Sequence, residues 1–190
     1  MRSPVETCAA ILQQPSGYMH AQRLQLPPAM DTTAVRAVID RLLLEELDLP
    51  MVSIQTLLAC PCASLWVRHW YRLPRIAALL GAYFLMPHLA KGAGWIRLST
   101  PQRRFALFQM GERTPCEAID RVPMDMRQEA LGLSALYSLQ TTVPHALAVR
   151  MPLLFSPDAQ AWQAHLPDVQ CPPVLFHMAV QHARFDQART

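Results

Sequence analysis

The stretch SLWVRHWYRLPRIAALLGAYF, Ser64 to Phe84, decides the fold that this sequence predicts. It places aromatic and basic residues next to a long uncharged run. At about 100° per residue, its apolar positions share one stripe of a helix and its arginines lie opposite. The candidate core residues are Trp66, Trp70, Leu73, Ala77, Leu80 and Phe84, and the arginines are Arg68, Arg72 and Arg75. The segment is therefore predicted to be amphipathic helix.

Pro74 interrupts this pattern, because a proline inside a helix removes a backbone donor and clashes with the preceding turn. Proline is well tolerated at the first position of a helix. We therefore expect two helices, one ending near Arg72 and one starting with Pro74.

Composition favours a folded, all-α protein. The chain has 190 residues, of which 52% are hydrophobic and 16% charged, and this is too apolar and too weakly charged for disorder. It contains 17 prolines but only 6 glycines, and few segments alternate apolar and polar residues. The prediction is a single domain over residues 1–190, an irregular compact helical domain of about eight to ten short helices with proline-rich corners.

Several helix starts can be read from capping signals. Ser3 with Glu6 has the form of a capping box, with Pro4 at the first helical position. Asp31, Thr100 and Thr114 are the expected caps of three later helices. The helix after Asp31 is the clearest one, because apolar residues recur at helical spacing in it. These residues are Val35, Val38, Ile39, Leu42 and Leu43.

Charge and hydropathy argue against two functional classes. The formal net charge of +3 is small for a nucleic-acid-binding protein. The uncharged run Ile76 to Leu89 contains Pro87 and His88 and is shorter than the roughly 20 apolar residues of a spanning helix. No secretory signal is visible at the start of the sequence. We expect an intracellular protein that binds no nucleic acid and does not insert into a membrane.

No local motif predicts catalysis, a cofactor or a metal. The sequence lacks G-x-G-x-x-G, and GLSAL at Gly132 to Leu136 has only half of a nucleophile elbow and lies in a helical pattern. Tetrahedral zinc needs two more ligands than Cys60 and Cys62 supply. The other cysteines and the seven histidines are scattered, with Cys8, Cys116 and Cys171 far apart and His177 and His182 five residues apart. An enzyme with a Cys/His metal site assembled in three dimensions remains an alternative, as does a peripheral membrane protein that uses an amphipathic helix.

Surface recognition is the strongest functional signal. Arg68, Arg72 and Arg75 could pair with carboxylates of an acidic partner, and Trp, Tyr and Arg dominate the energetics of interfaces. The simpler interpretation is that the tryptophans are core and the arginines only solvated, and the sequence does not choose between the two.

Three stretches resemble the OrgA/MxiK family of type III secretion proteins, also called SctK. The first is SGYMHAQRLQLPPAM, Ser16 to Met30, in which an aromatic residue, a histidine and an Arg-Leu pair precede a proline corner. The second is the opening stretch continued into PHLAKGA, and the third is VRMPLLFSP, Val149 to Pro157. They occur in the order that the family has.

The resemblance implies a structural function without catalysis. Proteins similar to this one are cytoplasmic adaptors of the injectisome's sorting platform, recruited to the inner membrane through their partners. They link the cytoplasmic domain of the inner-membrane-ring protein, SctD, to the pod protein, SctQ. The pod in turn connects to the stator SctL and the ATPase SctN. The candidate partner-binding residues are Arg68, Arg72 and Arg75, together with Tyr18, His20 and Arg23.

Overall fold

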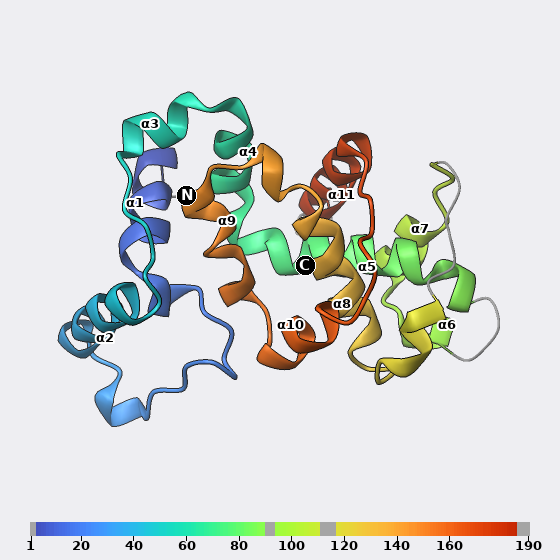
Figure 1. Cartoon of the computed structure of the whole chain (residues 1–190), viewed down its shortest axis with the longest axis horizontal. Coiled ribbons are helices and arrows are strands. Elements are labelled where there is room, and N and C mark those ends of the chain that lie inside the picture. Colours follow the sequence, from blue (N-terminus) through green and yellow to red (C-terminus); the bar gives the residue numbers. More distant parts are fainter. Residues whose placement is uncertain (1–2, 90–93, 111–116, 186–190) are drawn as a thin grey trace. The chain divides into compact units, whose positions relative to one another are not determined.

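The computed structural model describes residues 3–89, 94–110 and 117–185. Over these ranges the chain forms α-helices and 3-10 turns and no β-strand, so the all-α prediction is confirmed (Figure 1). Eight of the described helices have seven or more residues. The chain divides into two compact units, one made of residues 1–71 and 140–157 and the other of residues 72–139 and 158–190. Each unit therefore combines segments that are far apart in the sequence.

The first unit contains the N-terminal helices and a segment that returns to it late in the chain. Its α-helices are α1 (Pro4–Gln13), α2 (Thr33–Glu46), α3 (Ile54–Ala59), α4 (Pro61–His69) and α9 (His145–Ala148). Its 3-10 turns are η1 (Pro15–Gly17), η2 (Pro28–Met30), η5 (Gln140–Thr142) and η6 (Met151–Leu154).

The second unit is organised around two long helices, α5 (Leu73–Leu89) and α8 (Arg127–Tyr137). Glycines allow these helices to approach closely, because a Cβ atom on Gly81 would overlap the carbonyl oxygen of Gln128, and one on Gly132 would overlap that of Ala77. The remaining elements are α6 (Gly94–Arg97), α7 (Thr100–Ala106), η4 (Glu117–Arg121), α10 (Pro157–Gln163) and α11 (Pro173–Phe185).

The stretch from Ser64 to Phe84 forms two helices, as expected. Helix α4 ends at His69, the 3-10 turn η3 covers Trp70–Arg72, and α5 has Pro74 at its second position. Because a 3-10 turn advances about 120° per residue rather than 100°, one helical wheel does not describe the whole stretch. Arg68 belongs to the first unit, and Arg72 and Arg75 belong to the second.

The candidate core residues are buried, with one exception. Trp66 and Trp70 lie in the core of the first unit, with 3% and 0% of their surface exposed. Leu73, Ala77 and Leu80 are buried in the second unit. Phe84 is half-buried and packs against a cluster of buried residues in that unit. The cluster is Ala82, Leu85, Leu89, Leu98, Ala106, Ile119, Val122, Ala130, Leu131 and Leu166.

The capping predictions were correct for α1 and displaced by one residue elsewhere. At α1, the Ser3 hydroxyl accepts from the Glu6 amide at 3.2 Å, and the Glu6 carboxylate accepts from the Ser3 amide at 2.7 Å. The cap of α2 is Thr32, not Asp31, because Asp31 pairs with Arg36 instead. The cap of α7 is Ser99, not Thr100. The expected cap Thr114 lies outside the described residues.

Candidate interaction surfaces

The buried side chain of Arg150 is the centre of the first unit. It has 0% of its surface exposed, and its guanidinium donates to the carbonyl oxygens of Pro50 and Ala146 at 2.9 Å and of Leu12 at 3.1 Å. None of the described carboxylates pairs with it. Burial lowers the pKa of the guanidinium, and the neighbouring Tyr18 opposes that shift. Arg150 thus joins α1, α9 and the segment before α3.

Tyr18 completes the same cluster. Its hydroxyl donates to the carbonyl oxygen of Ile11 at 3.1 Å, and its ring packs edge-on against Trp70 with the ring centroids 5.5 Å apart. Burial raises the pKa of the hydroxyl above its ordinary value. Tyr18 and Arg150 together satisfy two carbonyl groups in the last turn of α1, which have no partner within the helix. A cation is also favourable at the C-terminal end of a helix.

Tyr18, a candidate for partner binding, lies inside this cluster with 7% of its surface exposed, so little of its side chain is accessible to a partner. His20 and Arg23 are half-buried. The His20 amide donates to the carbonyl oxygen of Leu153 at 2.8 Å, and the Arg23 Nε donates to that of Phe155 at 2.8 Å. These contacts fix the loop after η1 against η6.

The three stretches that carry the family resemblance therefore meet inside the first unit. Tyr18 belongs to the first stretch, Trp70 to the second, and Arg150 and Phe155 to the third. Their shared role is to hold this unit together. Arg150 was not singled out from the sequence. Its position as the single charged residue of the otherwise uncharged stretch ALAVRMPLLF was a signal that could have identified it.

Of the candidate arginines, Arg68 is exposed, whereas Arg72 and Arg75 are half-buried. Arg68 lies in the last turn of α4. A guanidinium in this position is available to a carboxylate of another protein.

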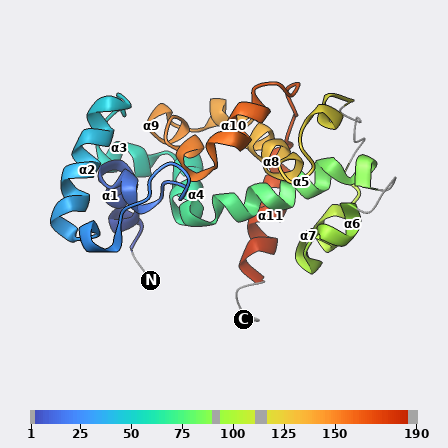
Figure 2. The same ribbon diagram turned by 90° about the horizontal axis from the view of Figure 1, so that it is seen from below.

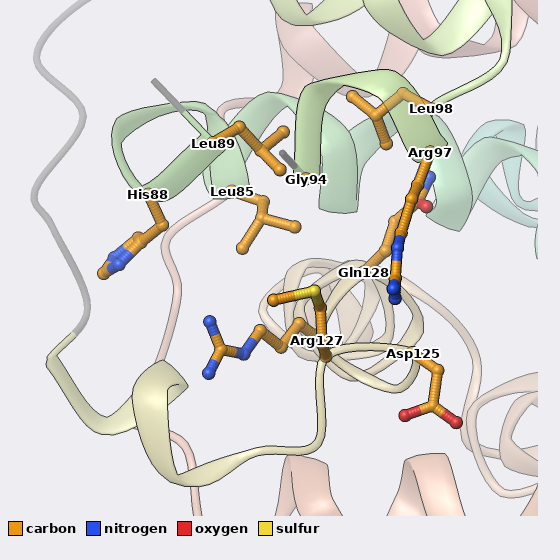
Figure 3. A pocket seen from close by; sticks show the side chains of 10 residues that line it. Leu85, His88, Leu89, Gly94, Arg97, Leu98, Asp125, Arg127 and Gln128 are labelled. Atoms are coloured by element: carbon orange, nitrogen blue, oxygen red, sulfur yellow. The ribbon is translucent and has the colours of Figure 1, made fainter. Parts of the chain in front are cut away.

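The second unit contains a pocket of about 420 Å³ between α5, α6 and the start of α8 (Figure 3). Leu85, Leu89 and Leu98 form its apolar side. Arg97 is exposed and extends from α6 toward Gln128, as Figure 3 shows. The pocket thus combines an apolar wall with a cation.

Another arginine of this pocket already has partners. The Arg127 guanidinium donates to the carbonyl oxygens of Val122 at 2.9 Å and Asp120 at 3.0 Å, and lies 3.3 Å from the Asp120 carboxylate. The ring of His88 lies 3.8 Å from the same carboxylate. These contacts hold η4 beside α5 and α8.

The described ranges hold neither a metal-binding cluster nor a helix that could span a membrane. There, no group of three or more His, Cys, Asp and Glu side chains could hold a metal ion. Cys8 and Cys171 are buried, Cys60 is half-buried and Cys62 is exposed, and Cys116 lies outside the described residues. No helix in the described part of the chain is both long and apolar enough to cross a membrane.

Comparison with known proteins gives a family. Residues 8–185 match the family model described as "Bacterial type III secretion apparatus protein (OrgA_MxiK)". The chain is 34% identical over 151 residues to the oxygen-regulated invasion protein OrgA of Salmonella typhimurium strains LT2, SL1344 and 14028s. The alignment covers 77% of this chain and 73% of the relative. No solved structure matches the chain.

Proposed function

The chain belongs to the OrgA/MxiK family of bacterial type III secretion apparatus proteins, and we propose that it is a non-enzymatic adaptor in such an apparatus. It links the cytoplasmic domain of the inner-membrane-ring protein, SctD, to the pod protein of the sorting platform, SctQ. Through the pod it is connected to the stator SctL and the ATPase SctN. These partners hold it at the cytoplasmic face of the inner membrane. The observation that carries this proposal is the family match, which extends over most of both units.

We further propose that the arginines of the Ser64–Phe84 stretch contribute to binding one of these neighbours. Arg68 is the strongest candidate because it is the exposed one. Arg72, Arg75, His20 and Arg23 are half-buried, so only part of each side chain is accessible. An acidic surface on the partner would complement this group.

The first test is a pull-down of the tagged full-length protein from a bacterium that makes the whole apparatus, with the recovered proteins identified by mass spectrometry. Recovery of the ring protein and the pod protein together would support the adaptor function. Recovery of neither, with the protein folded, would contradict it.

The arginine proposal is tested by charge reversal in the same experiment. Arg68→Glu, alone and with Arg72→Glu, should reduce recovery of one neighbour and leave the other unchanged. Arg104→Glu is the matched control, because Arg104 is an exposed arginine near the end of another helix, α7. If the double variant folds and still binds both neighbours, these arginines do not contribute to binding either of them.

A further inference from the structure

Helix α2 is attached to the first unit by polar contacts on one face. Asp40 is its only buried residue, and its carboxylate accepts from the Ser16 amide at 2.8 Å. Arg36 pairs with Asp31 and donates to the Ser16 carbonyl oxygen at 3.4 Å. Asp40 and Arg36 thus both contact Ser16 of η1, and Asp31 lies just before the start of α2. In both views α2 lies at the edge of its unit (Figures 1 and 2).

The opposite face of α2 is apolar and accessible. At about 100° per residue, Val35, Val38, Ile39 and Leu42 form one stripe on the side away from Asp40. Val38 and Leu42 have 48% and 49% of their surface exposed, and Val35 and Ile39 are half-buried. Single exposed apolar residues are common on proteins, but four at helical spacing are the pattern by which one helix docks against another. We call these four residues the α2 stripe.

Acidic residues surround the C-terminal end of the α2 stripe. Glu45 and Glu46 lie on either side of the position of Leu42, and Asp48 lies two residues beyond the end of the helix. All three are exposed, and within the described ranges none makes an ion pair. The end of a helix also carries partial negative charge from its backbone carbonyls. This end of the stripe therefore attracts positive charge.

A second copy of this chain fits the stripe poorly. If two α2 helices packed in parallel, their acidic ends would repel each other. If they packed antiparallel, each acidic end would meet only the partial positive charge of the backbone at the start of the other helix, because Arg36 in that turn is already paired with Asp31. A different protein with Lys or Arg beside its apolar face would complement the acidic end with full charges.

We propose that the α2 stripe binds an amphipathic helix of another apparatus protein, one with an apolar face and with Lys or Arg beside it. The apolar face of that helix covers Val38 and Leu42, and its basic residues pair with Glu45 and Glu46. The proposal rests on the proposed adaptor function, because it adds a surface by which the adaptor holds a neighbour.

The test is photo-crosslinking in a bacterium that makes the whole apparatus. Benzoylphenylalanine is placed at Val38 or at Leu42 in separate full-length variants, and at Ala37 as the matched control. Ala37 is exposed on the same helix but lies on the other side of it. The expected result is an adduct from Val38 and Leu42 that is absent from Ala37. Mass spectrometry should map it to a segment of another protein with apolar residues at helical spacing and Lys or Arg among them.

Charge reversal tests the electrostatic part. Glu46→Lys should lower the adduct yield from Leu42 about tenfold, which corresponds to about 1.4 kcal/mol. Asp168→Lys makes the same charge change at an exposed site on the second unit and should leave the yield unchanged. Circular dichroism of each purified variant checks that the helices are retained.

Four results would overturn the proposal: no adduct, equal adducts from Ala37, an adduct to a second copy of this chain, or a yield that Glu46→Lys does not alter. The pull-down separates this inference from the adaptor function. Recovery of the ring and pod proteins without an adduct at the α2 stripe contradicts the inference alone. Loss of both proteins from the wild-type pull-down contradicts the adaptor function itself.

Discussion

Arg150 combines a full positive charge with complete burial. Hydrogen bonds to backbone carbonyl groups, rather than a counter-ion, stabilise the buried guanidinium. A planar guanidinium can donate to several carbonyl groups at once, and here it reaches three that come from separate segments. Lysine carries the same charge but has a compact ammonium group that cannot span these acceptors. Lysine, which keeps the charge but not the hydrogen-bond geometry, is therefore the informative substitution.

Arg150→Lys should lower the free energy of unfolding by about 2–4 kcal/mol, since it leaves buried carbonyl groups without donors while the charge stays buried. Urea denaturation followed by circular dichroism measures the change. Arg68→Lys is the control, and because Arg68 is exposed in the same unit it should change stability by no more than about 0.5 kcal/mol. Equal effects of the two substitutions would show that the buried contacts contribute little.

Cys171 provides a prediction for alkaline pH. Its side chain is buried, and burial raises the pKa of the thiol from 9.0 to about 12. Below pH 9 both the folded and the unfolded chain keep the proton, so this contribution to stability is complete. Between pH 9 and 12 only the unfolded chain loses it, and stability falls by up to about 1.4 kcal/mol per pH unit.

Cys171→Ser removes this titration, so the free energy of unfolding of the wild type should decline more steeply than that of the variant between pH 9 and 11. Denaturant unfolding at several pH values in this range gives the two slopes. Other groups, including Tyr18, titrate equally in both proteins and cancel in the difference. Parallel curves would mean that the thiol is accessible to water in the folded protein.

At the scale of elements, close packing of α5 and α8 depends on two glycines. Gly81→Ala and Gly132→Ala should each lower the free energy of unfolding by at least about 2 kcal/mol, because each new methyl group meets backbone atoms of the facing helix. Thermal unfolding followed by circular dichroism measures this. Gly17→Ala is the control, since nothing lies within 4 Å of its added Cβ. Wild-type stability of Gly132→Ala would show that the helices can separate at little cost.

Local signals in the sequence predicted where helices begin better than they predicted which segments pack against one another. Ser3 and Glu6 identified the start of α1 because a capping box involves only four consecutive residues. The starts of α2 and α7 were misplaced by one residue, because Asp31 and Thr32, or Ser99 and Thr100, are all good caps and the choice depends on other contacts.

Contacts between distant segments could not be predicted from a single sequence. Helical spacing showed that Val38 and Leu42 share a face, but it could not show that this face stays accessible. Likewise, Tyr18 was a candidate for partner binding, and the sequence could not show that it is buried, because an aromatic residue suits an interface and a core equally well. Its burial follows from Trp70 and Arg150, which are far away in the sequence.

At the scale of the whole molecule, the way the two units alternate along the chain affects how cooperatively they unfold. The chain passes from one unit to the other at residues 71–72, 139–140 and 157–158, so neither unit is a continuous segment. The second unit lies between two parts of the first in the sequence. Each unit consists of two segments that are joined through a segment of the other unit. When one unit unfolds, that joining segment becomes a flexible loop, and closing it costs entropy in the unit that is still folded. We therefore propose that residues 1–190 unfold as a single domain.

Hydrogen–deuterium exchange with mass spectrometry at increasing urea concentration tests this proposal without an attached probe. Peptides from α1 and α9 report on the first unit, and peptides from α5 and α8 report on the second. A single domain gives coincident midpoints, and Arg150→Lys should lower both by the same amount although it changes only the first unit. If that substitution lowers the midpoint of α1 and α9 and leaves α5 and α8 unchanged, the units are independent domains, and partner binding should then be assigned to each of them separately.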